Sequence, residues 1–437
     1  MHPTLLALLM AICSLWVVAG WLATLWVTRK KRSSPHPCVG LTVLKPLCGT
    51  HAGLEANLES FYGQDHPRFE IIFGARDPDD PALAVARRVA ARHAGTPTRF
   101  VVHEQGRDLN LKVRNIRAML PQAHYDLIVV SDSSIRAPQH YLRELVGMYQ
   151  SHRADLVMNL FSSPDDRTLG AALESVQESG FVAAGVALPT LLGQAAVVGK
   201  STLFSRSQFA RLGGFSRLSD LLAEDFVLGK IYQYAGLKVV VAPTVLQNIT
   251  GQGSVRDFIA RHLRWSMLRW RLKPAVTALE PLTRPLTLLP AALHFWGWPG
   301  LAWAVSLWVL RDVGGHLVLR GARRAWLPLL LSPVCDLLML MAWGWAALKR
   351  HVSWHGTRLR LGAGSLIYRE RERRSRPAPH AEDALGDVVL HTFRKELAHA
   401  CTMVDRLSSC GDGSGAGRSN GLWSVGEPNA GHWPGAQ

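Results

Sequence analysis

Acidic residues occur at three points of the chain where carboxylates could take part in chemistry. Asp77 follows an apolar run in the segment GARDPDDPA, and Asp132 follows another in SDSSIRAP. Glu224 and Asp225 begin a helical pattern in AEDFVLGK. Carboxylates can bind a divalent cation or accept a proton. For each residue alone a structural role is the simpler explanation, because aspartates form turns after strands and acidic residues complement the dipole of a first helical turn.

A basic segment follows these carboxylates. Arg261, Arg264 and Trp265 lie in VRDFIARHLRWSMLRWRL, whose amphipathic pattern predicts a helix over residues 255–272 within an interfacial segment of residues 254–281. Such a helix can lie at a membrane surface, with arginines on anionic lipid and tryptophans at headgroup level. Guanidinium groups also bind phosphate. The two roles are compatible, so the pattern alone leaves both open.

Short apolar runs alternate with helical patterns over residues 38–253, and this order predicts an α/β domain with a mostly parallel, doubly wound sheet. Ligands bind outside the carboxyl ends of the strands in such sheets, which is where Asp77 and Asp132 fall. The predicted strands cover residues 41–44, 70–74, 99–103, 126–131, 155–159 and 238–242.

The chain begins with an apolar run, residues 5–27, that is long enough to cross about 30 Å of hydrocarbon. Four basic residues at 29–32 follow it directly, which predicts a signal anchor with its positive flank in the cytoplasm. A cleaved signal peptide would carry its positive charge before the apolar core. We therefore expect a transmembrane helix here.

Membrane segments are expected again over residues 285–348. Pro285–Leu310 is uncharged but interrupted by prolines and glycines, which favours a re-entrant hairpin, whereas Trp326–Leu348 is a cleaner span. Asp336 inside that span is a candidate functional acid, or it faces a loop or pairs with an arginine. Basic residues flank both ends of the span, which leaves its topology open.

The other segments and the composition are less specific. We expect a basic cytoplasmic segment over residues 349–370 and a disordered tail over 371–437. The formal charge of +16 suits an anionic partner, which could be phospholipid, a nucleotide diphosphate or nucleic acid. The 48% hydrophobic content and 15 tryptophans suggest contact with lipid. The six cysteines form no CxxC pair, so we expect reduced thiols.

Taken in order, the motifs resemble a known enzyme signature. An aspartate after an early strand, SDS after a middle strand, ED opening a helix and then RxxRW resemble the D, D, D, (Q/R)xxRW pattern of GT-A glycosyltransferases. The segments RDPDDPA, NLKVRN, DLIVVSDSSIR, AEDFVLGK, RHLRWSMLRWRLKP and VSWHGTRLRL narrow the resemblance to the ceramide glucosyltransferase family. This resemblance covers residues 5–361.

The resemblance implies a GT-A fold, a Rossmann-like nucleotide-diphospho-sugar transferase domain, with transmembrane helices on either side. It implies transfer of a hexose, glucose in the first place, from a UDP-sugar to the primary hydroxyl of ceramide. The anomeric configuration would invert, and the catalytic domain would face the cytoplasm. The expected partners are the UDP-sugar, the lipid acceptor and the bilayer, and no nucleic acid.

Residue roles follow from the same resemblance. Asp132 would bind Mg²⁺ or Mn²⁺ bridging the diphosphate, although Ser134 replaces the usual second acid and leaves the protein's share of the ligands small. Asp225 would act as the base on the lipid hydroxyl. The expected substrate-binding residues are Asp77, Lys112, Asp132 and Glu224, and the expected catalytic residues are Asp225, Arg261, Arg264 and Trp265.

Three alternatives share part of this pattern. A transferase acting on a hopanoid or another bacterial glycolipid would carry the same aspartates. A processive polysaccharide synthase would also carry the signature, but it normally needs more spanning helices than this chain offers. A non-catalytic membrane scaffold would have no reason to combine the three aspartates with the basic helix.

Overall fold

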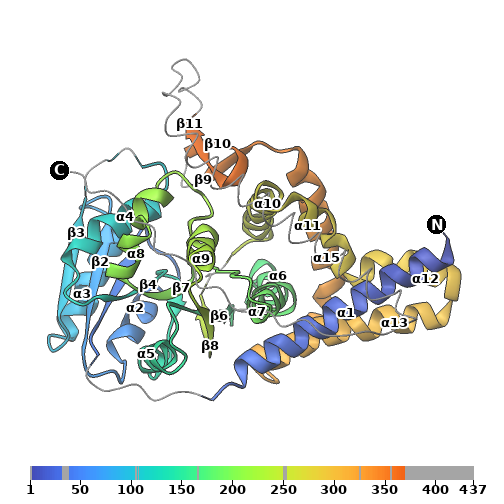
Figure 1. Ribbon diagram of the computed structural model, residues 1–437, viewed down its shortest axis with the longest axis horizontal. Helices are drawn as coiled ribbons and strands as arrows, with labels where there is room; N and C mark the ends of the chain where they lie inside the picture. Colours follow the sequence, from blue (N-terminus) through green and yellow to red (C-terminus); the bar gives the residue numbers. More distant parts are fainter. Residues whose placement is uncertain are drawn as a thin grey trace, which may run out of the picture. The chain divides into compact units, whose positions relative to one another are not determined.

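The computed structural model describes residues 2–31, 39–103, 106, 108–164, 167–249, 253–323, 326–354 and 357–369. The tail predicted over 371–437 lies outside these residues. An eight-stranded sheet has the order β3-β2-β1-β4-β7-β6-β8-β5 (Figure 1). Its strands are β1 Leu41–Pro46, β2 Phe69–Ala75, β3 Thr98–Val102, β4 Leu127–Ser131, β5 Ile135–Arg136, β6 Leu156–Ser162, β7 Ser201–Ser205 and β8 Val239–Asn248.

The sheet confirms the predicted α/β class and corrects its strand directions. Strands β3, β2, β1 and β4 run parallel, but β7 is antiparallel to both β4 and β6, and β5 is antiparallel to β8. The sheet is therefore mixed rather than mostly parallel. Strand β7 was not predicted because its sequence STLFS lacks an apolar run, although all five residues are buried.

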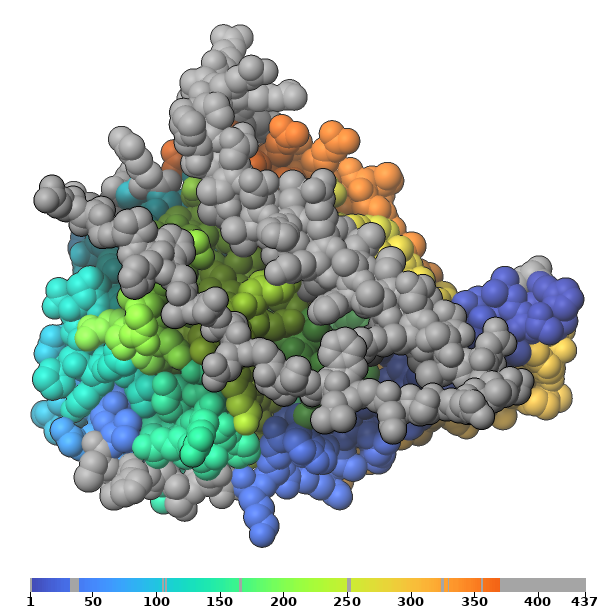
Figure 2. Space-filling view, viewed as in Figure 1, coloured from blue at the N-terminus to red at the C-terminus, as the bar shows by residue number. Residues whose placement is uncertain are grey.

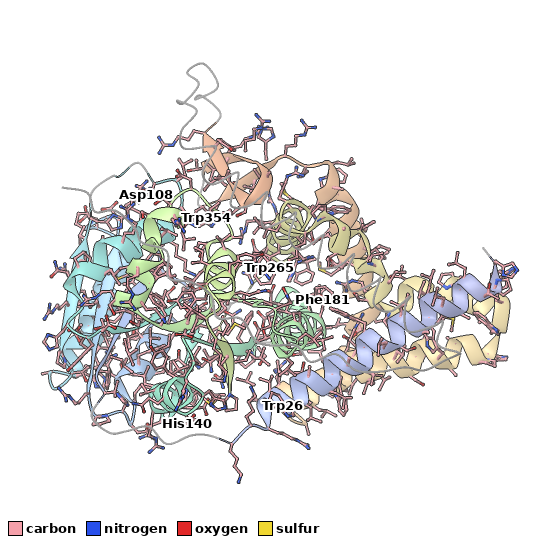
Figure 3. All side chains as sticks on the ribbon, viewed as in Figure 1. Trp26, Asp108, His140, Phe181, Trp265 and Trp354 are labelled. Carbon is pink, nitrogen blue, oxygen red and sulfur yellow. The ribbon has the colours of Figure 1, made fainter. Side chains whose placement is uncertain are left out.

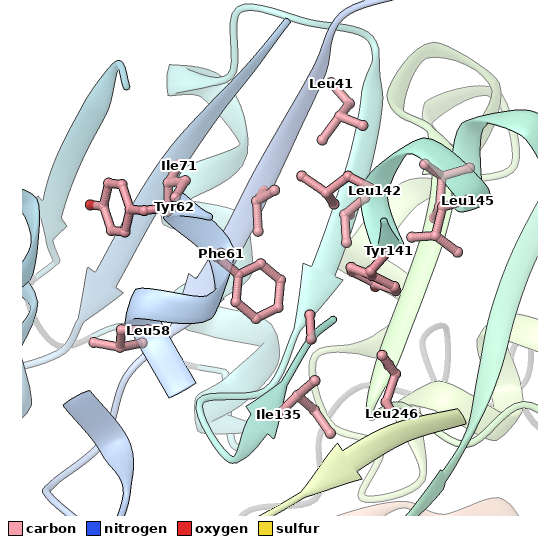
Figure 4. Close-up of a cluster of buried hydrophobic side chains, with 14 of the residues drawn as sticks. Leu41, Leu58, Phe61, Tyr62, Ile71, Ile135, Tyr141, Leu142, Leu145 and Leu246 are labelled. Carbon is pink, nitrogen blue, oxygen red and sulfur yellow. The ribbon is translucent and has the colours of Figure 1, made fainter. Parts of the chain in front are cut away.

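Helices cover the sheet, and a hydrophobic core lies beneath them (Figure 1). Phe61 of α2 and Tyr141 of α5 meet edge to face with ring centroids 6.0 Å apart, and both are fully buried (Figure 4). Their packing fixes two helices over the strands that lead to Asp77 and Asp132. The helices of this domain are α2 Leu54–Tyr62, α3 Pro81–Arg92, α4 Leu111–Met119, α5 Tyr141–Ser151, α6 Leu169–Gln177, α7 Ala183–Leu191, α8 Arg206–Arg211 and α9 Glu224–Tyr234.

The basic segment forms helix α10, Val255–Leu272, with the predicted bounds. A capping box between Ser254 and Asp257 begins it, so two otherwise unpaired backbone N–H groups are satisfied. Its apolar face packs on a second, three-stranded sheet and on α15, Leu327–Leu348. This sheet, β9 His351–Trp354, β10 Thr357–Leu361 and β11 Ile367–Arg369, was not predicted and occupies the expected basic segment.

Apolar helices form the rest of the described chain. Helix α1, Pro3–Thr28, and the Leu330–Leu348 part of α15 are long and apolar enough to cross a membrane, by length and composition. The interrupted segment forms α12, Pro285–Trp296, and α13, Trp298–Trp308, which meet at Gly297 with a positive φ of 56°. Helix α1 packs beside them through the cluster containing Cys13, Val17, Leu288 and Leu307 (Figures 1 and 2).

Asp336 of α15 pairs with arginines, which is one of the three possibilities that the sequence left open beside a functional acid and an acid facing a loop. Its carboxylate lies 2.6 Å from Arg284 and 2.8 Å from Arg311, and all three side chains are buried. Arg311 also pairs with Asp312 at 2.7 Å. Because every charge in this group has an opposite partner, the group joins α15 to the chain on either side of α12 and α13.

Asp336→Asn is expected to destabilise the fold by about 3–5 kcal/mol, because it leaves two buried arginines without their shared carboxylate. Unfolding of the detergent-solubilised protein followed by intrinsic tryptophan fluorescence would measure this. The control is Glu55→Gln, which removes a surface partner of Arg92 and should change stability by less than about 1 kcal/mol. Equal effects of the two substitutions would contradict a structural role for Asp336.

Candidate active site

One cavity of about 1200 Å³ lies between the carboxyl ends of the strands and helix α10. Parallel strands bring the turns after β2 and β4 to the same edge of the sheet, and α4 and α9 begin beside them. Every site residue predicted from the sequence lines this cavity: Asp77, Lys112, Asp132, Glu224, Asp225, Arg261, Arg264 and Trp265.

Asp77 has the structural role weighed for it, and its place at the cavity is compatible with the proposed role in substrate binding. Its Oδ1 accepts a hydrogen bond from the backbone N–H of Asp79 at 3.0 Å, so it shapes the turn after β2. The residue is exposed and also lines the cavity. The neighbouring Asp80 caps α3 by accepting the backbone N–H of Ala82 at 2.8 Å, so two carboxylates here are partly structural.

Asp132 lies between two lysines. Its Oδ1 is 2.8 Å from Lys112 Nζ and its Oδ2 is 3.5 Å from Lys200 Nζ. Burial alone would raise the pKa of Asp132, but the two ammonium groups outweigh it and hold the pKa below its usual range. Asp132 is therefore ionised at neutral pH, as a ligand of a cation must be.

Lys112 is held by a group of carboxylates. Besides Asp132, its ammonium lies 3.3 Å from Glu224, whose other oxygen accepts from the Asn110 side chain at 3.0 Å. Burial would lower the pKa of Lys112, but Asp132, Glu224 and Asp225 together raise it. Burial raises the pKa of Glu224 against the opposing effect of Lys112. Glu224 thus serves first to hold the lysine.

Asp225 is oriented by backbone groups. Its Oδ2 accepts from the N–H of Gly199 at 2.5 Å, and its Oδ1 accepts from the N–H of Phe226 at 2.7 Å. A Cβ at position 199 would lie 2.7 Å from the Cβ of Asp225, so a glycine is needed for this approach. The carbonyl of Gly199 accepts from Lys112 at 2.9 Å, so the backbone of this one residue contacts both the lysine and the proposed base.

The two arginines of α10 differ in their partners. Arg261 lies 3.2 Å from the buried Glu174, whereas Arg264 makes no ion pair or hydrogen bond within the part of the chain that the structure describes. Trp265, labelled in Figure 3, lies on the same helix. It lines the cavity and packs against the hydrophobic core, and its ring centroid is 5.2 Å from that of His262. Arg264 is therefore the guanidinium best placed to receive an incoming anion.

Two further lysines were missed from the sequence. Lys200 follows Gly199 and pairs with Asp132. Lys45 is fully buried at the end of β1, donates to the backbone carbonyl of Asp132 at 2.8 Å, and lies 3.7 Å from the centre of the Phe61 ring. Burial lowers the pKa of Lys45 to about 7. Its position within the apolar run LTVLKP could have indicated a buried lysine with a polar partner, because lysines are rarely fully buried without one.

The protein offers few oxygen ligands to a metal ion at this site, which suits a divalent cation bound mainly by the phosphates of the substrate. No group of three possible ligands occurs among the residues with described positions, and Ser134 donates its hydroxyl to Asn248 at 3.0 Å. The SDSS segment therefore offers a cation a single carboxylate, Asp132, which lines the cavity. Mg²⁺ is commonly bound through one or two carboxylates together with substrate phosphates and water, which fits this arrangement.

Behind Ser134 lies a buried acid, Glu178, whose Oε1 accepts from the Asn248 side chain at 2.8 Å. Burial, with a smaller effect of Glu174, raises the pKa of Glu178 from 4.5 to about 7. Because the folded pKa is raised, the bound proton stabilises the fold fully below pH 4.5, and this stabilisation is lost as the pH rises through about 7.

Glu178→Gln should remove this dependence, which is worth roughly 3 kcal/mol. The wild type should then lose more stability than the variant between about pH 5 and about pH 8, as measured by thermal unfolding in detergent. The exposed Glu55→Gln is the control, since it should keep the wild-type slope. A variant that also keeps that slope would show that Glu178 does not titrate in this range.

The fold and the site together define an α/β enzyme whose cavity adjoins apolar helices. The model of glycosyl transferase family 21 matches residues 4–367. The chain belongs to this family of glycosyltransferases, which confirms the family expected from the motifs.

Individual relatives agree with this assignment. Ceramide glucosyltransferase 1 of Caenorhabditis elegans is 28% identical over 251 residues, which are 57% of this chain and 54% of that protein. Ceramide glucosyltransferase 3 of the same organism is 26% identical over 249 residues, 56% of this chain and 53% of that protein. The chain spans about half the length of these curated relatives.

Among solved structures, the mannosyltransferase PcManGT from Pyrobaculum calidifontis, in complex with GDP-Man and Mn²⁺, is similar to 78% of this chain over 99% of its own length. Its sequence identity is 19% and the TM-score is 0.45.

Proposed function

We propose that the chain transfers a hexose from a UDP-sugar to the primary hydroxyl of a membrane lipid, with glucose and ceramide as the first candidates. The observation that carries this proposal is that one cavity joins the carboxylates and Arg264 to apolar side chains of α1, a candidate membrane span. Both a charged donor and a lipid acceptor therefore have suitable surroundings in the same space. The names of the curated relatives support ceramide as the acceptor.

The chemistry follows from the residues around the cavity. Asp225 accepts the proton of the acceptor hydroxyl as its oxygen bonds to the anomeric carbon, and the bond from that carbon to the UDP oxygen breaks. A single displacement of this kind inverts the anomeric configuration. Arg264, with Arg261 beside it, offsets the charge that develops on the leaving UDP. When bound at Asp132, Mg²⁺ or Mn²⁺ would neutralise part of the diphosphate charge.

The remaining residues position the donor. Asp77 lies at the cavity wall where the uridine and ribose would bind. Lys112 can offset diphosphate charge while Glu224 holds its ammonium in place. With α1 in the bilayer and its basic flank on the cytoplasmic side, the catalytic domain would face the cytoplasm.

An assay with purified, detergent-solubilised protein tests the proposal. Ceramide would be offered with UDP-glucose, UDP-galactose or UDP-N-acetylglucosamine, each with and without Mg²⁺ or Mn²⁺, and glycolipid products would be identified by mass. A hexosylceramide from one donor is the expected result. If ceramide gave no product but total membrane lipid released UDP, another lipid, such as a hopanoid or a bacterial glycolipid, would be the acceptor. If neither lipid released UDP from any donor, the proposed transfer would be wrong.

A further inference from the structure

Helix α1 is long and apolar enough to cross a membrane, and it also lines the cavity. Building on the proposed function, we propose that α1 and α7 form the two walls of a groove that holds a hydrocarbon chain of the lipid acceptor. The N-terminal helix would then be part of the acceptor site and would help to select the acceptor.

Side chains on one face of α1 line the cavity. These are Leu9, Ile12 and Trp16, which are spaced by three and four residues and therefore lie on the same face of the helix. Seven residues of α-helix rise about 10 Å, so the stripe extends over that length. A membrane anchor alone would have no reason to turn one stripe into a cavity that also contains the proposed catalytic residues.

Helix α7 provides a matching stripe. Val182, directly before α7, is followed along the cavity by Gly185, Val186 and Pro189, with the same spacing of three to four residues. Helices α1 and α7 pack closely, since a Cβ at Gly20 of α1 would lie only 2.8 Å from the Cβ of Ala184. The two apolar stripes therefore face one continuous space.

The cavity wall along α10 carries both basic and apolar side chains. Arg261, Arg264 and Arg269 line it, and so do Leu268 and Leu272, with Lys273 directly after the helix. Arg269 is paired with Glu280 at 2.8 Å, which neutralises its charge beside the two leucines. An acceptor whose hydroxyl lies beside Asp225 would thus find apolar side chains for its hydrocarbon part on α10 as well as on α1 and α7.

Exposed apolar residues frame the mouth of the groove. Ile12, Val276 and Leu279 all line the cavity, yet they are 46%, 64% and 60% exposed. Apolar residues at an open rim that includes a candidate membrane span indicate an opening toward lipid. Polar groups placed against these three side chains would be unpaired, so a hydrocarbon chain is the occupant that fits this apolar part of the rim.

Gly185 allows the groove to be blocked without disturbing the helix, because a Cβ added there meets no atom within 4 Å. Gly185→Leu is expected to lower kcat/KM for ceramide by about tenfold or more, since the chain must then enter an overfilled groove. The KM for UDP-glucose should not change. The matched control is Gly344→Leu on α15, where an added Cβ also meets nothing within 4 Å and which does not line the cavity.

Photo-crosslinking tests the groove independently of turnover. A ceramide carrying a diazirine in its acyl chain should label residues 9–16 and 182–189 in the wild type and in Gly344→Leu, and should label them less in Gly185→Leu. Labelling confined to other segments, or equal labelling of the three proteins, would overturn the groove. Labelling does not depend on sugar transfer. If the transfer assay failed, the proposed function would be wrong, but the labelling pattern would still show whether a lipid chain binds in the groove.

Discussion

Asp225→Asn is expected to lower kcat by about 10²–10⁴ while the KM for the UDP-sugar stays close to the wild-type value. The amide oxygen can still accept the Gly199 N–H that orients Asp225, although the bond from the Phe226 N–H is lost, so the side chain should keep its position at the start of α9. What is lost is the group that accepts the proton of the lipid hydroxyl. Initial rates of glycolipid formation, with donor affinity measured separately by calorimetry, would separate these effects.

The matched control for Asp225→Asn is Asp65→Asn. Asp65 pairs with Arg143 at 2.8 Å, and it does not line the cavity. This variant should turn over at nearly the wild-type rate. If Asp225→Asn did the same, the proton would have to go elsewhere, and Asp225 would be reduced to a structural role at the start of α9.

Removing the guanidinium of Arg264 should have the second-largest effect. Arg264→Ala is expected to lower kcat by about 10²–10³, because an ordered donor beside the leaving diphosphate is lost. Arg264→Lys should recover part of the rate, since a lysine restores the charge without the forked geometry of a guanidinium. Steady-state rates with UDP-glucose and the lipid acceptor would measure both variants.

Arg256→Ala is the control on the same helix. Arg256 is exposed in the first turn of α10 and does not line the cavity, so its loss should weaken membrane contact at most. Arg261→Ala should be less damaging than Arg264→Ala, because Arg261 is already paired with Glu174. The reverse order would show that the paired arginine is the one that moves onto the diphosphate.

Much of the fold could be predicted because local patterns decide it. The apolar runs place six strands, and the amphipathic pattern of the basic segment places α10 within its observed bounds. Strand β7 was not predicted, because its polar residues are buried only through pairing with β4 and β6. That burial is a property of the sheet and not of the segment. The small β9–β11 sheet escaped for a similar reason, since its apolar face is buried against α10.

The candidate site likewise has residues that local sequence patterns predicted and residues that only the folded structure brought together. The resemblance in the ordered motifs singled out the carboxylates and arginines, and chain order alone placed Asp77 and Asp132 after strands. The pairing of Lys200 with Asp132 depends on an antiparallel strand that no pattern predicted. Lys45 reaches the same aspartate through the buried end of β1.

Sequence was sufficient for the class of fold, the apolar helices and the residue types at the site, because periodicity and short motifs are local properties. Only packing decided that Asp336 is paired and that α1 lines the cavity beside α7. Packing also decided that Arg261 pairs with Glu174, while Arg264 has no ion pair or hydrogen bond among the residues that the structure describes. These facts depend on side chains that are far apart in the chain and meet through helix and sheet packing. Such contacts leave no spacing in the sequence from which they could be predicted.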